Sequence, residues 1–368
     1  MHWKTHALIC AGTFLFATAQ ALETEAQPEI PLRQALVLKS VSRAGRSAVH
    51  TDPIEASIVN GRWQQPALGE KVATPGGDRE WESAATDKEG WLQPSGMRSG
   101  YVDWSVNSPH DQVMILEAAG QNLVYVNGEI RTGDPYAYGY VKIPVLLRSG
   151  TNDFLFQCSR GRLKAKLTEP QSNLFFNEAD PTLPDVRTGE RGPLKGAVVL
   201  VNASTHPVEA IVRSRGAKTA ESHVAIPPLE TRKAGFVFFP PRNPHGDSYT
   251  VRLEVLDQAH RGTILAHTEL KLRVRKQEQT YKRTFLSSID DSVQYYAVNP
   301  APVVGANAPA LFLSLHGASV EAIGQADAYS PKRWGNIVCP TNRRPYGFDW
   351  EEWGRLDAME VLAQAQTL

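Results

Sequence analysis

Cysteine is scarce in this chain of 368 residues, which contains only three. Cys10 lies in the apolar N-terminal stretch, which leaves Cys158 and Cys339 for the rest of the chain. One disulfide is arithmetically possible. Because the two cysteines fall on expected strands of different domains, we instead expect two buried free thiols, and a fold that does not depend on disulfides.

Recognisable metal and nucleotide motifs are also missing. No cysteine pair has zinc spacing, and the ten histidines form no H-x-H or HExxH pattern. The chain has neither a G-x-G-x-x-G fingerprint nor a P-loop. These patterns normally mark zinc, dinucleotide and phosphate sites. We therefore expect no metal and no cofactor.

The chain has no excess of positive or negative charge. Lys+Arg and Asp+Glu both number 39, so the formal net charge is zero. A balanced charge does not predict nucleic acid or an anionic membrane as a general partner. Beyond the N-terminal stretch, no apolar run approaches the roughly 20 residues that a membrane-spanning helix needs. The sequence therefore predicts no membrane span.

The first residues have the pattern of a secretory signal peptide. Lys4 precedes an apolar stretch from 7 to 17, and Ala19-Gln20-Ala21 forms a small-x-small cleavage site. This pattern predicts cleavage after Ala21 and a secreted or periplasmic protein. An uncleaved anchor is the alternative. We interpret residues 22–50 as a leading segment or linker.

Residues 51–180 have the texture of an antiparallel β-domain. The Asn127-Gly128 pair between alternating residues is a strong hairpin signal. Short apolar segments separated by turn residues are typical of a β-sandwich. They read "YVDWSV", "QVMILEAAG", "NLVYVNGEIRTG", "YVKIPVLL" and "NDFLFQCS".

The order of these segments resembles galactose-binding-like jelly rolls over about 70 residues. It runs from "LVYVNGE" through the tyrosine stretch at 136–140 to "IPVLLRSGTNDFLFQC". The resemblance implies possible carbohydrate binding, since aromatic rings pack against the apolar faces of sugars. The candidate stacking residues are Trp104, Tyr136, Tyr138 and Tyr140. The alternative is a spacer domain that binds nothing.

Residues 190–276 form a second block of alternating strands after a linker rich in Pro and Gly. Segments such as "TVRLEVLD" and "ELKLRVR" alternate apolar and charged residues, as strands with one wet face do. The length and strand spacing predict an immunoglobulin- or fibronectin-type-III-like sandwich. We find no catalytic pattern in this block.

The pattern changes to alternating strands and helices in residues 280–368. Phe285–Val298 is expected to form a hairpin, and "PALFLSLHG" and "NIVC" read as buried strands with helices after each. Such alternation predicts a parallel, doubly wound sheet. Asp349 and Glu352 fit a capping box before the last helix.

This ordered series, with "LFLSLHGA" and "IVCPTNRRPYGFDWEEWGR", resembles the start of an α/β-hydrolase domain of the prolyl-oligopeptidase-like group. The resemblance implies a serine peptidase or esterase, acting on a peptide, acyl ester or sugar ester. It places an oxyanion hole at Gly317, Ala318 and Ser319, whose N–H donors would stabilise a tetrahedral intermediate. His316 would fix this loop by a hydrogen bond or contact the substrate.

Arg343, Arg344 and Tyr346 follow the second buried strand, at the edge where such sheets bind ligands. They are candidates to contact a carboxylate or phosphate of the substrate. The alternative is that the arginines pair with acidic residues of their own segment, namely Asp349, Glu351 or Glu352.

The nucleophile motif G-x-S-x-G is missing from the sequence, and the acid and base that follow it in such hydrolases are missing too. We therefore expect two antiparallel β-sandwiches, jelly-roll-like and then Ig/Fn3-like, followed by the incomplete N-terminal part of an α/β-hydrolase sheet. The first hypothesis is the front portion of a secreted serine hydrolase, inactive as given. The alternative is a non-catalytic secreted β-sandwich protein that binds carbohydrate or protein.

Overall fold

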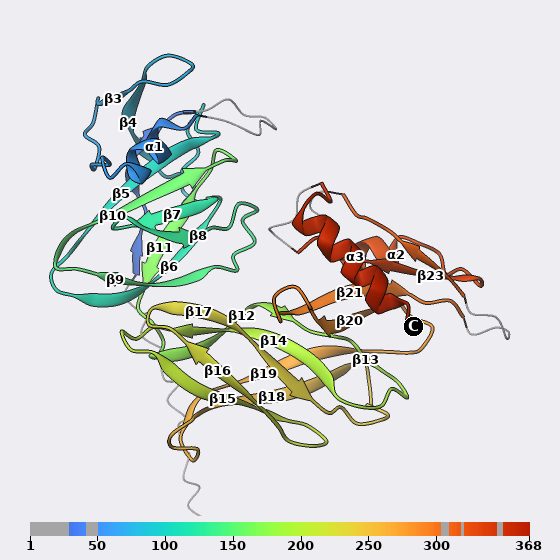
Figure 1. Ribbon diagram of the computed structural model, residues 1–368. Helices are drawn as coiled ribbons and strands as arrows, with labels where there is room; N and C mark the ends of the chain where they lie inside the picture. The colour runs from blue at the N-terminus through green and yellow to red at the C-terminus, as the bar shows by residue number, and fades with distance from the viewer. Residues whose placement is uncertain (1–28, 42–50, 303–308, 318–319, 344–348) are drawn as a thin grey trace, which may run out of the picture.

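The computed structural model describes residues 29–41, 51–302, 309–317, 320–343 and 349–368. The expected signal peptide, residues 1–21, lies outside these ranges. Figure 1 shows three bodies: a first β-sandwich, a second β-sandwich below it, and a smaller C-terminal segment beside both. None of the helices in the described ranges is long and apolar enough to cross a membrane.

The first sandwich packs a four-stranded sheet, β1-β11-β6-β9, against a seven-stranded sheet, β3-β4-β2-β5-β10-β7-β8. Side chains that alternate along the strands meet between the sheets, with Phe154, Phe156 and Trp104 in the core. The strands are β1 (Glu29–Pro31), β2 (Gln34–Leu38), β3 (Lys71–Val72), β4 (Arg79–Ala85), β5 (Gly100–Ser108), β6 (Gln112–Ala119), β7 (Leu123–Val126), β8 (Glu129–Thr132), β9 (Lys142–Leu147), β10 (Gly150–Cys158) and β11 (Lys164–Thr168).

The sandwich begins earlier in the chain than its strand spacing indicated. Strands β1 and β2 fall in the expected leading segment, yet β2 lies between β4 and β5 inside the seven-stranded sheet. A short apolar strand gains its stability from neighbours distant in sequence, which periodicity does not reveal. A short helix, α1 (Pro53–Val59), follows, and Asp52 caps its first turn through the amide groups of Ile54 and Glu55.

The hairpin between β7 and β8 forms as expected at Asn127-Gly128. Both residues have positive φ angles, 50° and 85°, as a two-residue hairpin turn requires. The thiols of Cys158 and Cys339 are free and buried, also as expected. Burial raises the pKa of both thiols, that of Cys339 to about 12, so both are poor nucleophiles.

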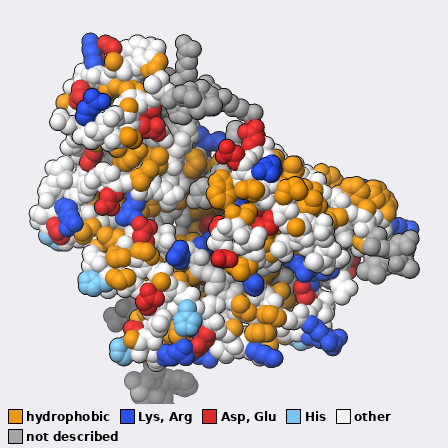
Figure 2. Space-filling view, in the orientation of Figure 1, with side chains coloured by type: hydrophobic (Ala, Val, Ile, Leu, Met, Phe, Trp, Pro, Cys, Tyr) orange, Lys and Arg blue, Asp and Glu red, His pale blue; other side chains and the backbone are white. Residues whose placement is uncertain are grey.

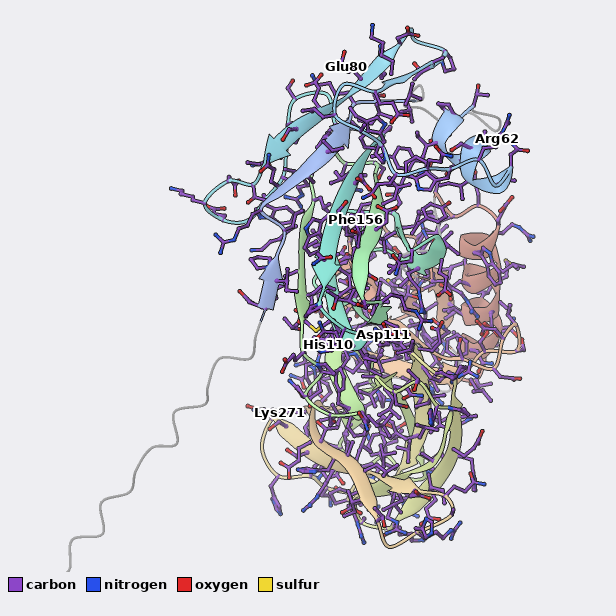
Figure 3. All side chains as sticks on the ribbon, turned by 90° about the vertical axis from the view of Figure 1, so that its left-hand side faces the viewer. Arg62, Glu80, His110, Asp111, Phe156 and Lys271 are labelled. Carbon is purple, nitrogen blue, oxygen red and sulfur yellow. The ribbon has the colours of Figure 1, made fainter. Side chains whose placement is uncertain are left out.

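The second sandwich packs β12-β14-β17 against β13-β19-β18-β15-β16. Strand β12 covers residues that we assigned to the first domain and the linker, but it pairs with β14. Figure 3 shows Phe156 within the upper sandwich and Lys271 on the lower one. The strands are β12 (Leu174–Thr182), β13 (Val186–Arg187), β14 (Leu194–Asn202), β15 (Val208–Arg215), β16 (Ala220–Ile226), β17 (Glu230–Phe238), β18 (Ser248–Asp257) and β19 (Ile264–Arg275).

The two sandwiches are joined by an apolar cluster and by polar contacts. Ile115 of the first sandwich packs against Phe175 and Val201 of the second. Arg131 on β8 forms an ion pair of 2.7 Å with Glu230 and donates a hydrogen bond of 3.1 Å to the Leu229 carbonyl. This docking places the end of β8 and the start of β9 against the second sandwich.

The C-terminal segment contains a four-stranded sheet in the order β20-β21-β23-β22. Within the described ranges only β22 and β23 are parallel, while β21 pairs antiparallel with both β20 and β23. The expected doubly wound parallel sheet, and with it the α/β-hydrolase sheet, is therefore corrected to a small mixed sheet. Its elements are β20 (Tyr281–Leu286), β21 (Val293–Asn299), β22 (Ala310–Leu313), α2 (Ala322–Asp327), β23 (Gly335–Cys339) and α3 (Trp353–Ala365).

The predicted capping box is also wrong. Glu352 occupies the N-cap of α3 with φ 42°, and no side chain caps the helix there. Asp349 has φ 51°, so this approach to α3 is left-handed rather than the extended entry that a capping box uses. Figure 2 shows hydrophobic side chains gathered on the surface of this segment.

Candidate functional site

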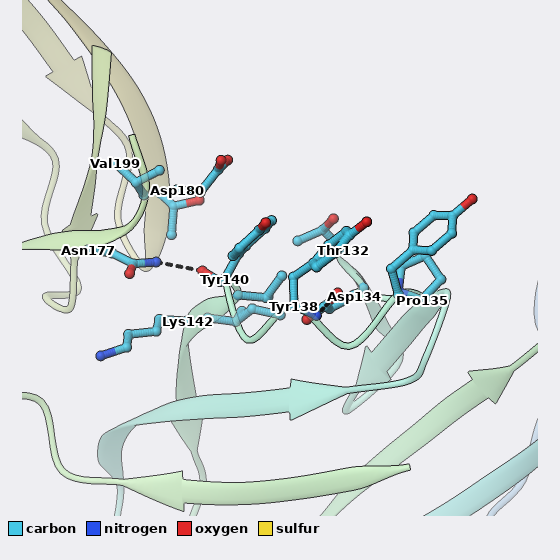
Figure 4. A pocket seen from close by; sticks show the side chains of 14 residues that line it. Thr132, Asp134, Pro135, Tyr138, Tyr140, Lys142, Asn177, Asp180 and Val199 are labelled. Carbon is cyan, nitrogen blue, oxygen red and sulfur yellow. Dashed lines mark hydrogen bonds between the residues drawn. The ribbon is translucent and has the colours of Figure 1, made fainter. Parts of the chain in front are cut away.

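A row of three tyrosines lies in the loop between β8 and β9. Tyr136, Tyr138 and Tyr140 are spaced by two residues, and the residues between them, Ala137 and Gly139, have positive φ angles of 58° and 75°. The rings of Tyr136 and Tyr138 stack at 5.7 Å, and those of Tyr138 and Tyr140 at 4.9 Å. Figure 4 shows the Tyr138 and Tyr140 rings side by side and nearly parallel.

The side chain of Asp134 holds this loop in place. It is only 4% exposed, and its two oxygens accept hydrogen bonds from the amides of Tyr138 (3.0 Å) and Gly139 (2.7 Å). A carboxylate that accepts two backbone N–H groups makes strong, charge-assisted hydrogen bonds. Sequence reasoning missed Asp134. The Gly133-Asp134-Pro135 stretch indicates a turn, but it does not indicate what the carboxylate binds.

The loop also depends on close approach of backbone at Gly133. A Cβ atom added there would lie 2.2 Å from the carbonyl oxygen of Asn122. Only glycine fits such a contact. The tyrosine loop is therefore held in two ways. Its start packs closely against the residues before β7, and its middle is hydrogen-bonded to Asp134.

The second sandwich supplies the opposite wall of the site. Asn177 on β12 is 3% exposed, and its amide donates a hydrogen bond of 2.7 Å to the carbonyl of Tyr140. Strand pairing between β12 and β14 is irregular from Asn177 to Thr182, as at a β-bulge. Asp180 lies in this irregular stretch and forms an ion pair of 2.9 Å with Lys233. Bulges often re-aim side chains next to functional sites.

Together these walls enclose a cavity of about 200 Å³ between the two sandwiches (Figure 4). Tyr138 is 40% exposed, so part of the tyrosine row is open to a ligand. The guanidinium of Arg160 covers the Tyr136 ring at 4.2 Å and closes one end of the row. The lining residues are Thr132, Gly133, Asp134, Pro135, Tyr136, Tyr138, Tyr140, Val141, Lys142, Ile143, Asn177, Asp180, Val199 and Thr231.

Trp104, the fourth residue predicted to stack on a sugar, lies elsewhere. It is 5% exposed and packs in the core of the first sandwich against Phe154, with ring centroids 5.4 Å apart. A buried indole has no free face for a ligand. Side chains alternate between the two faces of β5, and Trp104 lies on the face that packs against the opposing sheet. The sequence does not show which of the two faces is the inner one.

The predicted oxyanion loop is described only in part. Ala318 and Ser319 lie outside the described residues, and Gly317 is exposed. His316 is buried, with Nδ1 2.9 Å from the Gly317 carbonyl and its ring edge-on to Trp350. Trp350 in turn donates a hydrogen bond of 2.9 Å to the His316 carbonyl. The described contacts of His316 are thus with its own loop and with the approach to α3.

Arg343 is turned into the protein rather than toward a ligand. It is 5% exposed and lies 2.7 Å from Asp290 and 3.2 Å from Glu360, with a further hydrogen bond to Ser287. The arginine therefore pairs with acidic residues, although not with those that we considered in the sequence. Arg344 and Tyr346 lie outside the described residues.

No protein-family model and no curated protein sequence matches this chain. Solved structures with some similarity include a calcium-binding mutant of Bacteroides uniformis β-glucuronidase 2, with 11% identity and a TM-score of 0.32, covering 73% of this chain and 34% of that one. A putative β-galactosidase from Bacteroides fragilis has 13% identity and a TM-score of 0.32, covering 79% and 45%. A glycoside hydrolase family 2 β-galacturonidase from Eisenbergiella tayi, bound to galacturonate, has 11% identity and a TM-score of 0.30, covering 70% and 44%.

This chain spans between about a third and a half of the length of these structures. Similarity at this level carries no conclusion about activity. These structures are glycosidases, whereas prolyl-oligopeptidase-like hydrolases were expected. The assignment to that serine hydrolase group, and the peptidase or esterase function that depended on it, are therefore corrected, and a peptide substrate is not supported.

Proposed function

We propose that this protein is a non-catalytic, secreted β-sandwich protein that binds carbohydrate in the cavity beside Tyr136, Tyr138 and Tyr140. The observation that carries the proposal is the row of tyrosine rings, partly exposed at Tyr138, on a loop held by the buried carboxylate of Asp134. A rigid aromatic surface binds with little loss of conformational entropy.

The chemistry of the cavity suits a sugar ring. Tyr138 stacks on both neighbouring tyrosines and Arg160 covers Tyr136. The apolar surface for the C–H side of a sugar is therefore the exposed side of this row at Tyr138, with tyrosine hydroxyls for the polar rim. The opposite wall offers the Asp180–Lys233 ion pair and Thr231, which can accept from and donate to sugar hydroxyls. Ligand sites combine an apolar surface with a few placed polar groups in this way.

The acidic residues of this cavity do not favour glycoside hydrolysis. That reaction needs two available carboxyl groups on either side of the scissile bond. In the described structure, both oxygens of Asp134 accept from backbone amides, and Asp180 is paired with Lys233. These contacts support a binding role for the cavity rather than a catalytic one.

The test is binding of purified protein, residues 22–368, to an array of neutral and acidic oligosaccharides. Substitution Tyr138→Ala removes the most exposed ring. We expect it to weaken binding of any glycan that binds the unsubstituted protein about five- to tenfold, from ~1–1.4 kcal/mol of lost stacking.

Trp334→Ala is the matched control, because Trp334 is a 61% exposed aromatic outside the cavity. An equal loss of glycan affinity in both variants would indicate that glycans adhere nonspecifically to exposed aromatic side chains, and would contradict the proposed site. If the unsubstituted protein binds no glycan on the array, the proposal is wrong.

A further inference from the structure

We propose that the site takes a chain of neutral sugars, with one ring against the tyrosines and the following rings over Lys142 and across the outer face of β6 and β11. This inference rests on the proposed function. It adds the class of ligand, an uncharged oligosaccharide, and the direction in which it lies.

The cavity beside the tyrosines is too small for more than one sugar ring. Its volume of about 200 Å³ is below the roughly 300–1,000 Å³ of sites that enclose a drug-sized molecule. It therefore has room for one ring, and the rest of a longer ligand must leave it. A second cavity of about 470 Å³ lies next to it, and Lys142 lines both.

Lys142 connects the two cavities because it lies at the start of β9. It is the first residue of β9 and follows Tyr140 by two residues, so it lies where the tyrosine loop joins the strand. Figure 4 shows the Lys142 side chain leading away from the tyrosines, below Asn177. Across the sheet, Lys142 is paired in register with Glu117 on β6, which is paired in turn with Lys166 on β11.

These three side chains therefore form a row on the outer face of the four-stranded sheet. Lys166 is held by Glu29 at 3.0 Å, and Glu117 accepts a hydrogen bond of 3.3 Å from Thr168. Lys142 forms no ion pair within the described part of the chain. Its ammonium group is thus available to donate to sugar hydroxyls at the junction.

The floor of the second cavity is rigid and apolar. Ile115 and Phe175 line it, and both are buried in the cluster that joins the two sandwiches. A ring that lies over this floor meets an apolar surface below and polar groups at its rim. This is the same division of apolar and polar contacts that the tyrosine cavity offers to the first ring.

Charge then favours a neutral ligand over an acidic one. The lining contains two lysines, Lys142 and Lys166, and five carboxylates. With Lys233, which pairs with Asp180, and Arg160, which covers Tyr136, the carboxylates still outnumber the cations by one. A polyanionic chain would bring like charges together there, which disfavours binding. The acidic lining residues are Asp134, Asp180, Glu29, Glu117 and Glu169.

The experiment is isothermal titration calorimetry on residues 22–368 with three neutral series and one acidic polymer. The probes are the methyl β-glycosides, trisaccharides and pentasaccharides of β-1,4-linked glucose, xylose and galactose, together with polygalacturonate. In any series that binds, we expect the trisaccharide to bind about tenfold more tightly than the methyl glycoside, and polygalacturonate to bind more weakly than either.

Lys142→Ala should reduce the ratio between trisaccharide and methyl glycoside affinities toward one. The control Lys39→Ala changes a lysine that pairs with Glu82 away from both cavities, and should leave that ratio unchanged. Equal affinity for one and three rings, an unchanged ratio in Lys142→Ala, or preferred binding of polygalacturonate would overturn this inference while leaving the proposed function intact. Absence of binding by every probe would overturn both.

Discussion

The side-chain amide of Asn177 on the second sandwich donates a hydrogen bond of 2.7 Å to the backbone carbonyl of Tyr140 on the first. The carbonyl oxygen of the same amide accepts from the backbone N–H of Ala179 at 3.2 Å. One buried side chain therefore connects the tyrosine loop with the irregular stretch of β12. The candidate site belongs to both sandwiches, and neither contains it alone.

Substitution of Asn177 should therefore affect both docking and binding. Asn177→Ala leaves the Tyr140 carbonyl without its buried donor, which costs about 1–3 kcal/mol of folding free energy, and it should weaken glycan binding. Urea unfolding and calorimetric titration measure the two effects. Asn60→Ala, at an exposed amide that ends α1, is the control and should change stability by less than about 0.5 kcal/mol. A variant with unchanged affinity would show that the loop holds its shape without Asn177.

Asp134→Asn should disorder the tyrosine row while preserving the shape of the side chain. An amide has one acceptor oxygen, so its NH₂ group would face one of the two backbone donors, the amides of Tyr138 and Gly139. We expect a loss of about 1–3 kcal/mol and no measurable glycan binding. Tyrosine ring signals in NMR spectra would report the change, and an unaltered pattern in Asp134→Asn would contradict this account of the loop.

The stability of the first sandwich should fall as pH rises, because of Asp103. Burial, and then the neighbouring carboxyl of Asp153, raise the pKa of Asp103 from 3.8 to about 9. Oδ1 of each carboxyl is buried without a hydrogen-bond partner. A proton on Asp103 would relieve the repulsion between the two carboxyls. The folded state retains this proton while the unfolded state releases it. The stabilisation is therefore complete below about pH 4 and is lost progressively as pH rises toward 9.

Asp103→Asn removes this titration. Thermal unfolding followed at pH 5, 7 and 9 should show the unsubstituted protein losing stability across the range, and the variant losing less. The difference should be largest at pH 9, where Asp103→Asn should be the more stable of the two. Parallel pH profiles for both proteins would show that Asp103 does not hold the proton.

Arg343→Met should destabilise the C-terminal segment selectively. The guanidinium lies among Asp290, Glu360 and Asp357. Its removal leaves two buried carboxyl groups, those of Asp357 and Glu360, without a counter-charge. Burial already raises the pKa of Asp357 to about 6. Removing one partner of a buried ion pair lowers the free energy of unfolding by about 3–5 kcal/mol. Hydrogen exchange should show protection lost in β20, β21 and α3 but kept in both sandwiches, and uniform protection in the variant would count against this role.

Several local features could be predicted from the sequence because their causes are local. The hairpin at Asn127-Gly128 needs two residues that tolerate positive φ, and the sequence places them between alternating strands. The tyrosines at 136, 138 and 140 became candidates through the resemblance of their segment to galactose-binding-like jelly rolls. Asp134 was not recognised, because a buried carboxylate that binds backbone amides resembles any turn aspartate in a sequence.

The wrong predictions concern relationships between distant segments. The last quarter of the chain has strands and helices where periodicity indicated them, but their pairing is mixed rather than doubly wound. Arg343 was placed as a possible ligand contact, and its real partners include Asp290, which lies 53 residues earlier. Such partners become visible only when the chain is folded.

The sequence by itself determined the β-rich character of the protein, its free thiols and the turn that pairs β7 with β8, because alternation, composition and backbone preference act over a few residues. Only the tertiary structure decided that β2 enters the middle of a sheet, that Trp104 faces the core while Tyr138 faces solvent, and that Asn177 meets Tyr140 across two domains. Strand register and domain docking are set by the burial of whole faces against one another. The free energy gained by this burial depends on which distant segments pack together, and no local sequence pattern specifies those segments.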